Sequence, residues 1–164
     1  RMGVGQSARP GTPDGLGGVK LLVGQHSEKN RNEKKGANED RYAYVKKGNS
    51  HFLGVFDGHG GAEASEFVRK HLPQNFLNCP DIKTNPDEAL KKSFLSTDVE
   101  FLKSTQSGSG TCVNVVLVLE NTLFCANLGD CRAVVCHDGH PEVLSEDHKV
   151  STLSEKQRLE KEGW

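Results

Sequence analysis

Long hydrophobic runs are missing from this sequence of 164 residues, and so is an excess of charge of either sign. No apolar run approaches the roughly 20 residues that a transmembrane helix needs, and no secretory signal is evident. The formal net charge of −1 gives no electrostatic reason to expect nucleic acid as a partner. Hydrophobic residues make up only 34% of the chain, so we expect one domain with a modest core.

Cysteine is present, but not in the spacing of a metal or disulfide site. The 5 cysteines form no C-x-x-C pair, and most of them fall in apolar, strand-like stretches. We therefore expect buried, reduced thiols in an intracellular protein, cytoplasmic or nuclear, in preference to a zinc site or a disulfide framework. The cysteines are Cys79, Cys112, Cys125, Cys131 and Cys136.

Glycine is abundant, and it concentrates first at the N-terminus. Residues 1–18 are rich in glycine and proline and predict a flexible arm. Residues 2–7 also fit the M-G-x-x-x-[ST] pattern, so Gly3 would be myristoylated and tether the protein to a membrane if Met2 is the native start. A chance match in a disordered tail is the alternative.

A second group of glycines follows a short apolar run in the middle of the sequence. The run Phe52–Phe56 predicts a buried strand, which places Asp57 at the carboxyl end of that strand. A carboxylate, the bare carbonyl of Gly58 and the imidazole of His59 then crowd onto one tight turn. Mg²⁺ and Mn²⁺ prefer such oxygen ligands, and His59 offers a proton near neutral pH. A plain strand-to-helix turn with a surface histidine is the alternative.

The remaining pattern of strands and helices predicts an α+β fold. Helices are expected after the central turn until Pro73 ends or kinks the first, from Pro86 with Asn85 as N-cap, and over 151–163 with Ser154 as cap. Turns are expected at 47–50, 120–121 and 138–139. Strands are expected over 19–26, 41–45, 52–56, 112–119, 122–128 and 131–137.

Acidic residues stand on three separate turns, at Glu39-Asp40, Asp57 and Asp130. If these carboxylates converge, they repel one another unless cations lie between them. A two-metal site of this kind binds phosphate oxygens and activates water for in-line attack on phosphorus. Lys34 or Lys35 could hold the remaining charge of the phosphate. Three turns with solvated carboxylates are the alternative, because the sequence does not show convergence in space.

Several motifs, in order, resemble one family. The segment G-V-F-D-G-H-G-G at 54–61 resembles the signature of the metal-dependent protein serine/threonine phosphatases of type 2C, the PPM family. Several ordered motifs are far more specific than any one. The resemblance identifies 19–164 as the N-terminal portion of a type 2C catalytic domain, part of a four-layer α-β-β-α sandwich with mainly antiparallel sheets. The other motifs are K-G-A-N-E-D at 35–40, S-G-T-C at 109–112, A-N-L-G-D-C-R-A-V at 126–134 and L-S-E-D-H-K at 144–149.

The resemblance implies two metal ions, Mg²⁺ or Mn²⁺, and a third, weaker position. Asp57 would bridge the two ions, and the carbonyl of Gly58 would bind one of them. Glu39 and Asp40 would hold metal-bound waters. Asp130 would serve the third position.

The resemblance also implies roles outside the metal ligands. His59 would be the general acid, and Lys35 stands where many members carry an arginine that binds phosphate. A lysine lacks the bidentate fork of arginine, so phosphate affinity would be lower or more adaptable. We interpret Asp147 and His148 as structural and Asn38 as a turn residue.

The expected function is therefore hydrolysis of phosphoserine and phosphothreonine in protein substrates by metal-activated water. The family domain runs to ~250 residues or more, so the later aspartates that complete the first metal site are expected outside this sequence. A catalytically incomplete fragment, or a pseudophosphatase that acts as a binding module, is the alternative, and the incomplete sandwich predicts self-association. A nuclease is disfavoured because no basic surplus is present.

Overall fold

A computed structural model describes residues 21–28 and 36–163 of the chain. The flexible arm, the myristoylation site at Gly3 and the phosphate-binding Lys35, all predicted above, lie outside the described residues. The strands are β1 (Arg41–Lys47), β2 (Ser50–His59), β3 (Gly110–Leu119), β4 (Thr122–Leu128), β5 (Val134–His137) and β6 (His140–Val143). The helices are α1 (Glu63–Leu77), α2 (Pro86–Ser104) and α3 (Leu153–Lys161), and the short 3-10 helix η1 (Pro80–Lys83) joins α1 to α2.

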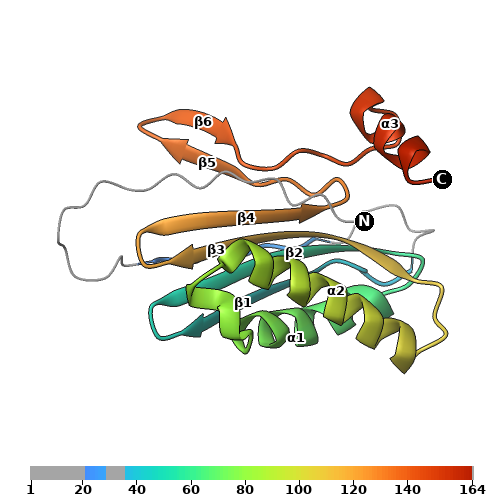
Figure 1. The fold of residues 1–164 in the computed structure, drawn as a ribbon, viewed down its shortest axis with the longest axis horizontal. Helices are drawn as coiled ribbons and strands as arrows, with labels where there is room; N and C mark the ends of the chain where they lie inside the picture. The colour runs from blue at the N-terminus through green and yellow to red at the C-terminus, as the bar shows by residue number, and fades with distance from the viewer. Residues whose placement is uncertain (1–20, 29–35, 164) are drawn as a thin grey trace.

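Four of the strands form one antiparallel sheet in the order β1-β2-β3-β4, as Figure 1 shows. Tight turns at the predicted positions connect β1 to β2 and β3 to β4, and Gly48 adopts a φ of 61° in the first of them. The predicted turn at Asp138-Gly139 joins β5 to β6, a separate two-stranded ribbon. Both residues of this turn have positive φ, as a two-residue hairpin loop of type I′ requires.

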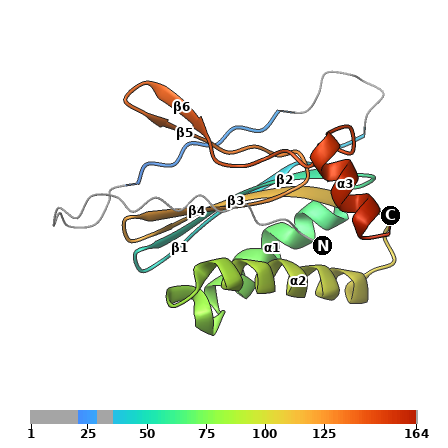
Figure 2. The ribbon, with the colours of Figure 1, turned by 45° about the horizontal axis from the view of Figure 1, so that its top comes forward.

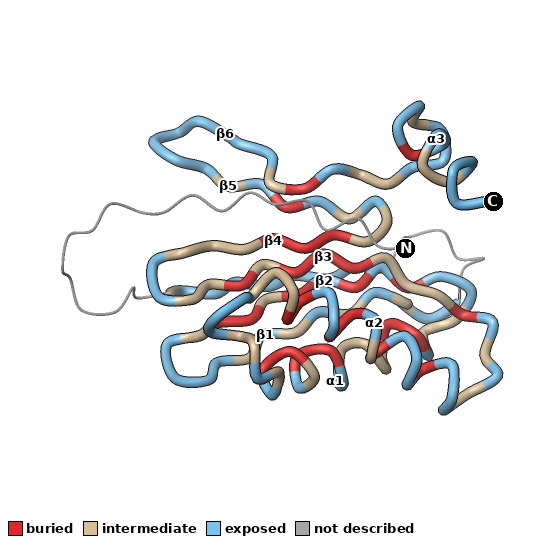
Figure 3. The backbone as a smooth tube through the Cα atoms, viewed as in Figure 1, coloured by how far each residue is buried: buried red, intermediate tan, exposed pale blue. Residues whose placement is uncertain are grey.

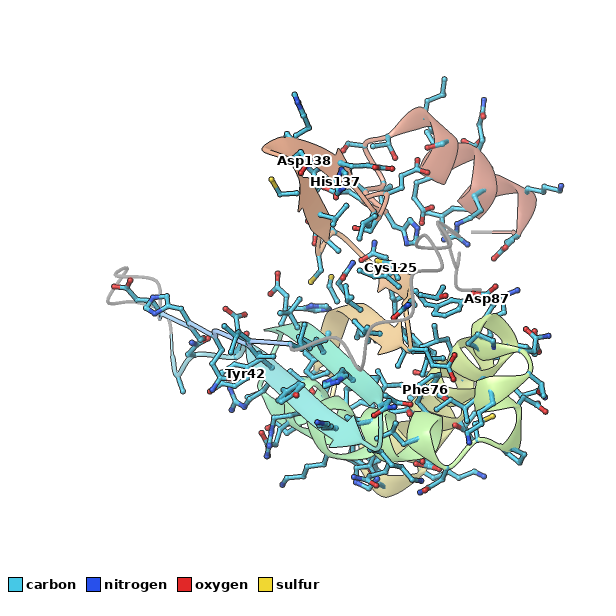
Figure 4. The ribbon with its side chains drawn as sticks, turned by 90° about the vertical axis from the view of Figure 1, so that its left-hand side faces the viewer. Tyr42, Phe76, Asp87, Cys125, His137 and Asp138 are labelled. Carbon is cyan, nitrogen blue, oxygen red and sulfur yellow. The ribbon has the colours of Figure 1, made fainter. Side chains whose placement is uncertain are left out.

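The hydrophobic core lies between one face of the sheet and the two helices α1 and α2 (Figure 3). Alternate residues of β2 point to this core, and Phe52 and Phe56 are almost fully buried there against Phe76 of α1. In Figure 4, Phe76 lies among the core side chains, whereas His137 and Asp138 lie at the tip of the β5–β6 ribbon. The predicted start of α2 is confirmed, because the side chain of Asn85 accepts a hydrogen bond from the Glu88 amide.

The opposite face of the sheet is only partly covered. Figure 2 shows α1 and α2 on one side of the sheet and the β5–β6 ribbon with α3 on the other. Tyr42, Tyr44 and Val55 on the second side remain 40–48% exposed. The predicted α+β class is confirmed, with a helical layer, a four-stranded sheet, and the ribbon and α3 beyond it.

Four predictions about strands and helices differ from the structure in detail. Residues 21–26 form no strand, and 131–133 precede β5 and are not part of it. Of the two outcomes predicted for Pro73, an end or a kink, the end is wrong, because α1 continues to Leu77 with core residues on both sides of the proline. The last helix begins after Thr152, so Ser154 lies inside α3 and is not its cap, although Gly163 follows the helix with a φ of 86°.

The cysteines are all free, as predicted, but they are not all buried. Cys125 is buried beneath the segment that leads from the ribbon to α3, whereas Cys136 is exposed because the ribbon packs on little else. Within the described residues, no helix has the length and apolar character needed to cross a membrane.

Candidate functional site

The central carboxylate, Asp57, lies on the face of the sheet opposite the helices. The residues of β2 alternate in burial, with Phe56 and Gly58 toward the helices and Asp57 toward the other side. The prediction that Asp57 follows the strand is wrong by two residues. Pairing continues past it, since Asp57 lies opposite Cys112 and His59 lies opposite Gly110.

Close packing explains two glycines of the site. A side chain at Gly58 would collide with the backbone carbonyl of Glu39, which accepts a hydrogen bond of 2.5 Å from Ser65. A side chain at Gly110 would lie 2.5 Å from Nε2 of His59. Glycine at 58 lets the backbone of Glu39 approach β2 closely, and glycine at 110 lets the His59 ring pack against β3.

The acidic pair Glu39-Asp40 is held against the end of β2 by hydrogen bonds. The Glu39 carboxylate accepts a hydrogen bond from the backbone amide of Gly61, at 3.0 Å. Asn38 is a turn residue, as predicted, because its side-chain oxygen accepts a bond from the amide of Asp40 at 2.9 Å. Arg41 donates to the carbonyls of Asn38 and Asp40 at 2.8 and 2.7 Å.

The third acidic residue, Asp130, lies on a turn that packs on β3. Gly129 before it has a φ of 87° and contacts the side chain of Cys112 so closely that a Cβ atom would not fit. The thiol of Cys112 lies 3.5 Å from Oδ1 of Asp130. Because Cys112 pairs with Asp57 across the sheet, this turn brings Asp130 to the same place as Asp57.

The electrostatic environment of Asp57 shows that the three acidic turns converge. Burial raises the pKa of Asp57 above its ordinary value, and the neighbouring carboxylates of Asp40 and Asp130 raise it further. His59 acts in the opposite direction on the same carboxyl. Lys149 contributes a positive charge nearby, with its amine 3.8 Å from Oδ2 of Asp130. Convergence, which the sequence left open, is therefore a property of the fold.

The donor chemistry at this place fits Mg²⁺ or Mn²⁺, because crowded carboxylate oxygens favour a hard cation between them. A depression of about 290 Å³ beside Asp57 is lined by Asp40, Arg41, Tyr42 and Cys131, among others. Among residues 21–28 and 36–163, however, no three His, Cys, Asp or Glu side chains are arranged to hold a metal ion. The predicted metal ligands are Asp57, Gly58, Asp40 and Asp130, and their role stays a prediction.

The sequence and the fold of this chain are similar to those of one known protein family. The model of the family described as protein phosphatase 2C matches residues 20–164. The chain belongs to the protein phosphatase 2C family. A probable protein phosphatase 2C of Arabidopsis thaliana (number 14) is 42% identical over 141 residues, 81% of this chain and 31% of that protein. A rice relative, probable protein phosphatase 2C 54 of Oryza sativa subsp. japonica, is 42% identical over 112 residues, 68% of this chain and 31% of that protein.

Solved structures agree with the fold of the phosphatase 2C family. The serine-threonine phosphatase 2C from Toxoplasma gondii matches with a TM-score of 0.66 at 22% identity, over 79% of this chain and 51% of that chain. A C. elegans sex-determining protein matches with a TM-score of 0.68 at 24% identity, over 79% of this chain and 36% of that chain. At these identities the likeness shows the fold alone. The chain spans about a third of the length of the curated relatives named above.

Several residues that shape the site carried no chemical signal in the sequence. Ser65 and Arg41 hold the Glu39-Asp40 pair through backbone carbonyls, and Asn127 holds the Asp130 turn in the same way. The family motif A-N-L-G-D contains Asn127, but only its burial and its hydrogen-bond partners identify what it does. Asp147 is structural, as predicted, with Arg132 donating to both of its oxygens at 2.9 and 2.8 Å.

Proposed function

We propose that this chain contributes to the catalytic centre of a metal-dependent protein phosphatase that hydrolyses phosphoserine and phosphothreonine in protein substrates. The observation that supports this most is the convergence of Asp40, Asp57 and Asp130, from three turns, on one face of the sheet beside His59. Family membership supports the same reaction class.

The acidic residues of the chain would bind two divalent cations, Mg²⁺ or Mn²⁺. When bound, these ions would polarise the phosphoryl group and make a water molecule a better nucleophile. Asp57 and the Gly58 carbonyl would ligate them directly, and Glu39 and Asp40 would orient their water shells. Asp130 would serve a further cation. The hydrogen bond from the Gly61 amide fixes the Glu39 carboxylate for this task.

His59 would complete the reaction as a proton donor. Water attacks phosphorus and gives up one proton to solvent, the bond from phosphorus to the serine or threonine oxygen breaks, and that oxygen takes a proton from His59, which solvent then restores. Its ring packs on Gly110 of β3, and His59 follows Asp57 by two residues on β2. Lys35, outside the described residues, would hold the phosphate from a second side.

The test is hydrolysis of p-nitrophenyl phosphate and a phosphothreonine peptide with and without Mn²⁺. It would use the chain and a form extended through the rest of the family domain. Asp57→Asn is expected to abolish Mn²⁺-dependent turnover, because it removes the central carboxylate. Asp138→Asn is the matched control, with the same chemical change on an exposed hairpin. Undiminished turnover by a folded Asp57→Asn variant would refute the proposal.

A binding module is the second candidate, favoured by the incomplete set of metal ligands in the described part of the chain. In that case the extended form would bind the phosphothreonine peptide without hydrolysing it. Fluorescence anisotropy of a labelled peptide, measured beside turnover, separates the two functions. Binding without turnover at saturating Mn²⁺ would select the module.

A further inference from the structure

A chain of buried amide groups lies beneath the turn that carries Asp130. Asn114 of β3 and Asn127 of β4 are 3% and 5% exposed, and they face each other across the sheet. The Asn114 amide nitrogen donates to Oδ1 of Asn127 at 2.9 Å. Cys125, labelled in Figure 4 on β4, completes the buried group, with its sulfur 3.9 Å from Oδ1 of Asn114.

Asn127 also forms hydrogen bonds with two separate loops. Its amide nitrogen donates to the carbonyl of Gly129 at 2.9 Å and to the carbonyl of Glu146 at 2.8 Å. The first loop carries Asp130, and the second leads to Lys149, whose amine approaches Asp130. One side chain therefore sets the distance between the two loops and fixes both to the central strands of the sheet.

Only an amide of this length can make these three bonds. Asparagine accepts through its oxygen and donates through both hydrogens of its nitrogen, whereas an ionised aspartate only accepts. The Asn127 side chain is 5% exposed, so its three bonds are made almost entirely to protein groups. The Gly129 carbonyl has a second donor, the amide of His148 at 2.9 Å, and the Glu146 carbonyl depends on Asn127 more strongly.

The position of Asp130 depends on this arrangement because its turn is held on two sides. The Asn127 amide of β4 donates to the Gly129 carbonyl, and Gly129 itself packs directly on the side chain of Cys112 of β3. With both contacts made, Asp130 lies near Asp57 on the neighbouring strand. Without the bond from Asn127, the turn keeps its packing on Cys112 and the bond from the His148 amide, but it loses the side-chain hydrogen bond that ties it to β4.

We infer that Asn127 is a positioning residue for the Asp130 carboxylate, with Asn114 as its anchor on β3. The inference concerns placement of the turn. It rests on the proposed function only where Asp130 is taken to bind a cation, so the first measurement below is independent of catalysis.

The experiment measures how fast Cys112 reacts with a thiol reagent, with the modified residue located by mass spectrometry. Because Cys112 is covered by Gly129 and lies beside Asp130, displacement of the turn exposes its sulfur. Asn127→Ala is expected to raise the labelling rate of Cys112 by about tenfold, since the two loops lose the hydrogen bonds that tie them to β4 and open locally more often. The rate at Cys79, which caps η1 on the helical side of the sheet, should stay unchanged.

Asn75→Ala is the matched control. It also removes an asparagine that bridges two elements, with bonds of 3.0 Å to Thr97 and to Glu100 of α2. That loss lies on the helical side of the sheet, so Cys112 should keep its protection. Equal Cys112 rates in Asn127→Ala and the parent chain would overturn the inference, and so would a rise of the same size at Cys79.

Asn114→Ala provides a second variant, for the case in which Asn127→Ala does not fold. It removes the anchor and leaves both donors of Asn127, so a smaller rise at Cys112 is expected, and no rise overturns the inference. In the extended form, Asn127→Ala should also raise the Mn²⁺ concentration needed for half-maximal turnover. If the labelling rate of Cys112 rises but neither the chain nor its extended form hydrolyses a phosphate ester, the proposed function fails and the positioning role of Asn127 stands.

Discussion

Single residues at this site act mainly through the backbone atoms of their neighbours. Ser65, Arg41 and Asn127 each bind a carbonyl next to an acidic residue, and none of them touches the carboxylates themselves. The main chain beside the acidic residues is therefore fixed by side chains that do not occupy the carboxylate oxygens. Such support is what a site needs when it must hold several like charges close together.

Gly58 is the residue at which this close packing can be tested. A Cβ atom there would collide with the backbone carbonyl of Glu39, and backbone cannot swing away as a flexible side chain can. Gly58→Ala is therefore expected to lower the free energy of unfolding by about 1–3 kcal/mol, measured by urea denaturation. It should also shift Glu39 away from the site.

Gly108→Ala is the control for this change, because nothing lies within 4 Å of a Cβ atom built at Gly108. Its free energy of unfolding should stay within about 0.5 kcal/mol of the parent value or rise slightly. A Gly58→Ala variant as stable as the Gly108→Ala variant would show that the contact with Glu39 does not constrain the fold.

At the scale of elements, α1 is tied to β1 by one carboxylate that three cations share. Glu66 of α1 accepts hydrogen bonds from Arg69 at 2.6 and 3.1 Å and from Arg41 of β1 at 2.9 Å, and Lys70 lies 3.1 Å away. The hydrogen bonds from Arg69, then those from Lys70 and Arg41, lower the pKa of Glu66 from 4.5 to about 2. Arg41 is also the residue that holds Asp40, so this group connects the helix to the site.

The depressed pKa predicts how stability responds to acid. A carboxyl that is more acidic in the folded chain stabilises it above its unfolded pKa of about 4.5, and this contribution is lost as the pH falls toward 2. Glu66→Gln is expected to lower the free energy of unfolding by about 1 kcal/mol near pH 7, because Glu66 is a partly exposed ion-pair group. Below pH 4 the difference in free energy of unfolding between the variant and the parent should become smaller. Urea denaturation at pH 7, 5 and 3 measures both.

Glu160→Gln, an exposed change on α3, serves as the control and should leave the pH dependence of unfolding as it is in the parent. If the parent and Glu66→Gln lose stability in parallel between pH 5 and 3, the ion pairs of Glu66 do not link α1 to β1 energetically.

The elements that the sequence predicted best are those defined by local signals. Turns with glycine or Asp-Gly, and the Asn85-Pro86 start of α2, stand where their residues place them. Predictions failed where tertiary contacts override local preference. Pro73 stays inside α1, and the pairing of Asp57 to His59 with β3 extends β2 past its apolar run.

The candidate site was predictable in its chemistry but not in its assembly. Motifs identified Asp40, Asp57, His59 and Asp130, because carboxylates and a histidine that stand together on glycine turns are typical of a metal-dependent catalytic site. That β3 would bring Cys112 and the Asp130 turn beside Asp57 depends on strand pairing, which a sequence does not give. The buried amides were missed for the same reason, since asparagine in a strand has no chemical signature of its own.

For the whole molecule, the uncovered face of the sheet decides how the chain behaves in solution. A depression of about 430 Å³ on this face is lined by Tyr42, Tyr44, Leu53, Val55 and Val134, among others, and Val55 is 48% exposed. Residues 23–26 also line this depression, and half-exposed apolar side chains on a partly covered sheet face favour association. The chain of 164 residues is therefore expected to self-associate through this face, and light scattering at rising concentration should show a growing average mass.

Substitution of one exposed valine on each side of the molecule locates the contact. Val55→Lys should restore a monomeric mass, because it places a charge in the middle of the open sheet face. Val99→Lys is the matched control, since Val99 of α2 is 47% exposed on the helical side, and this variant should associate like the parent. A monomeric parent chain would contradict the prediction, and loss of association in Val99→Lys alone would place the contact on α2 instead. A form extended through the rest of the family domain should be monomeric if the added strands cover the same face.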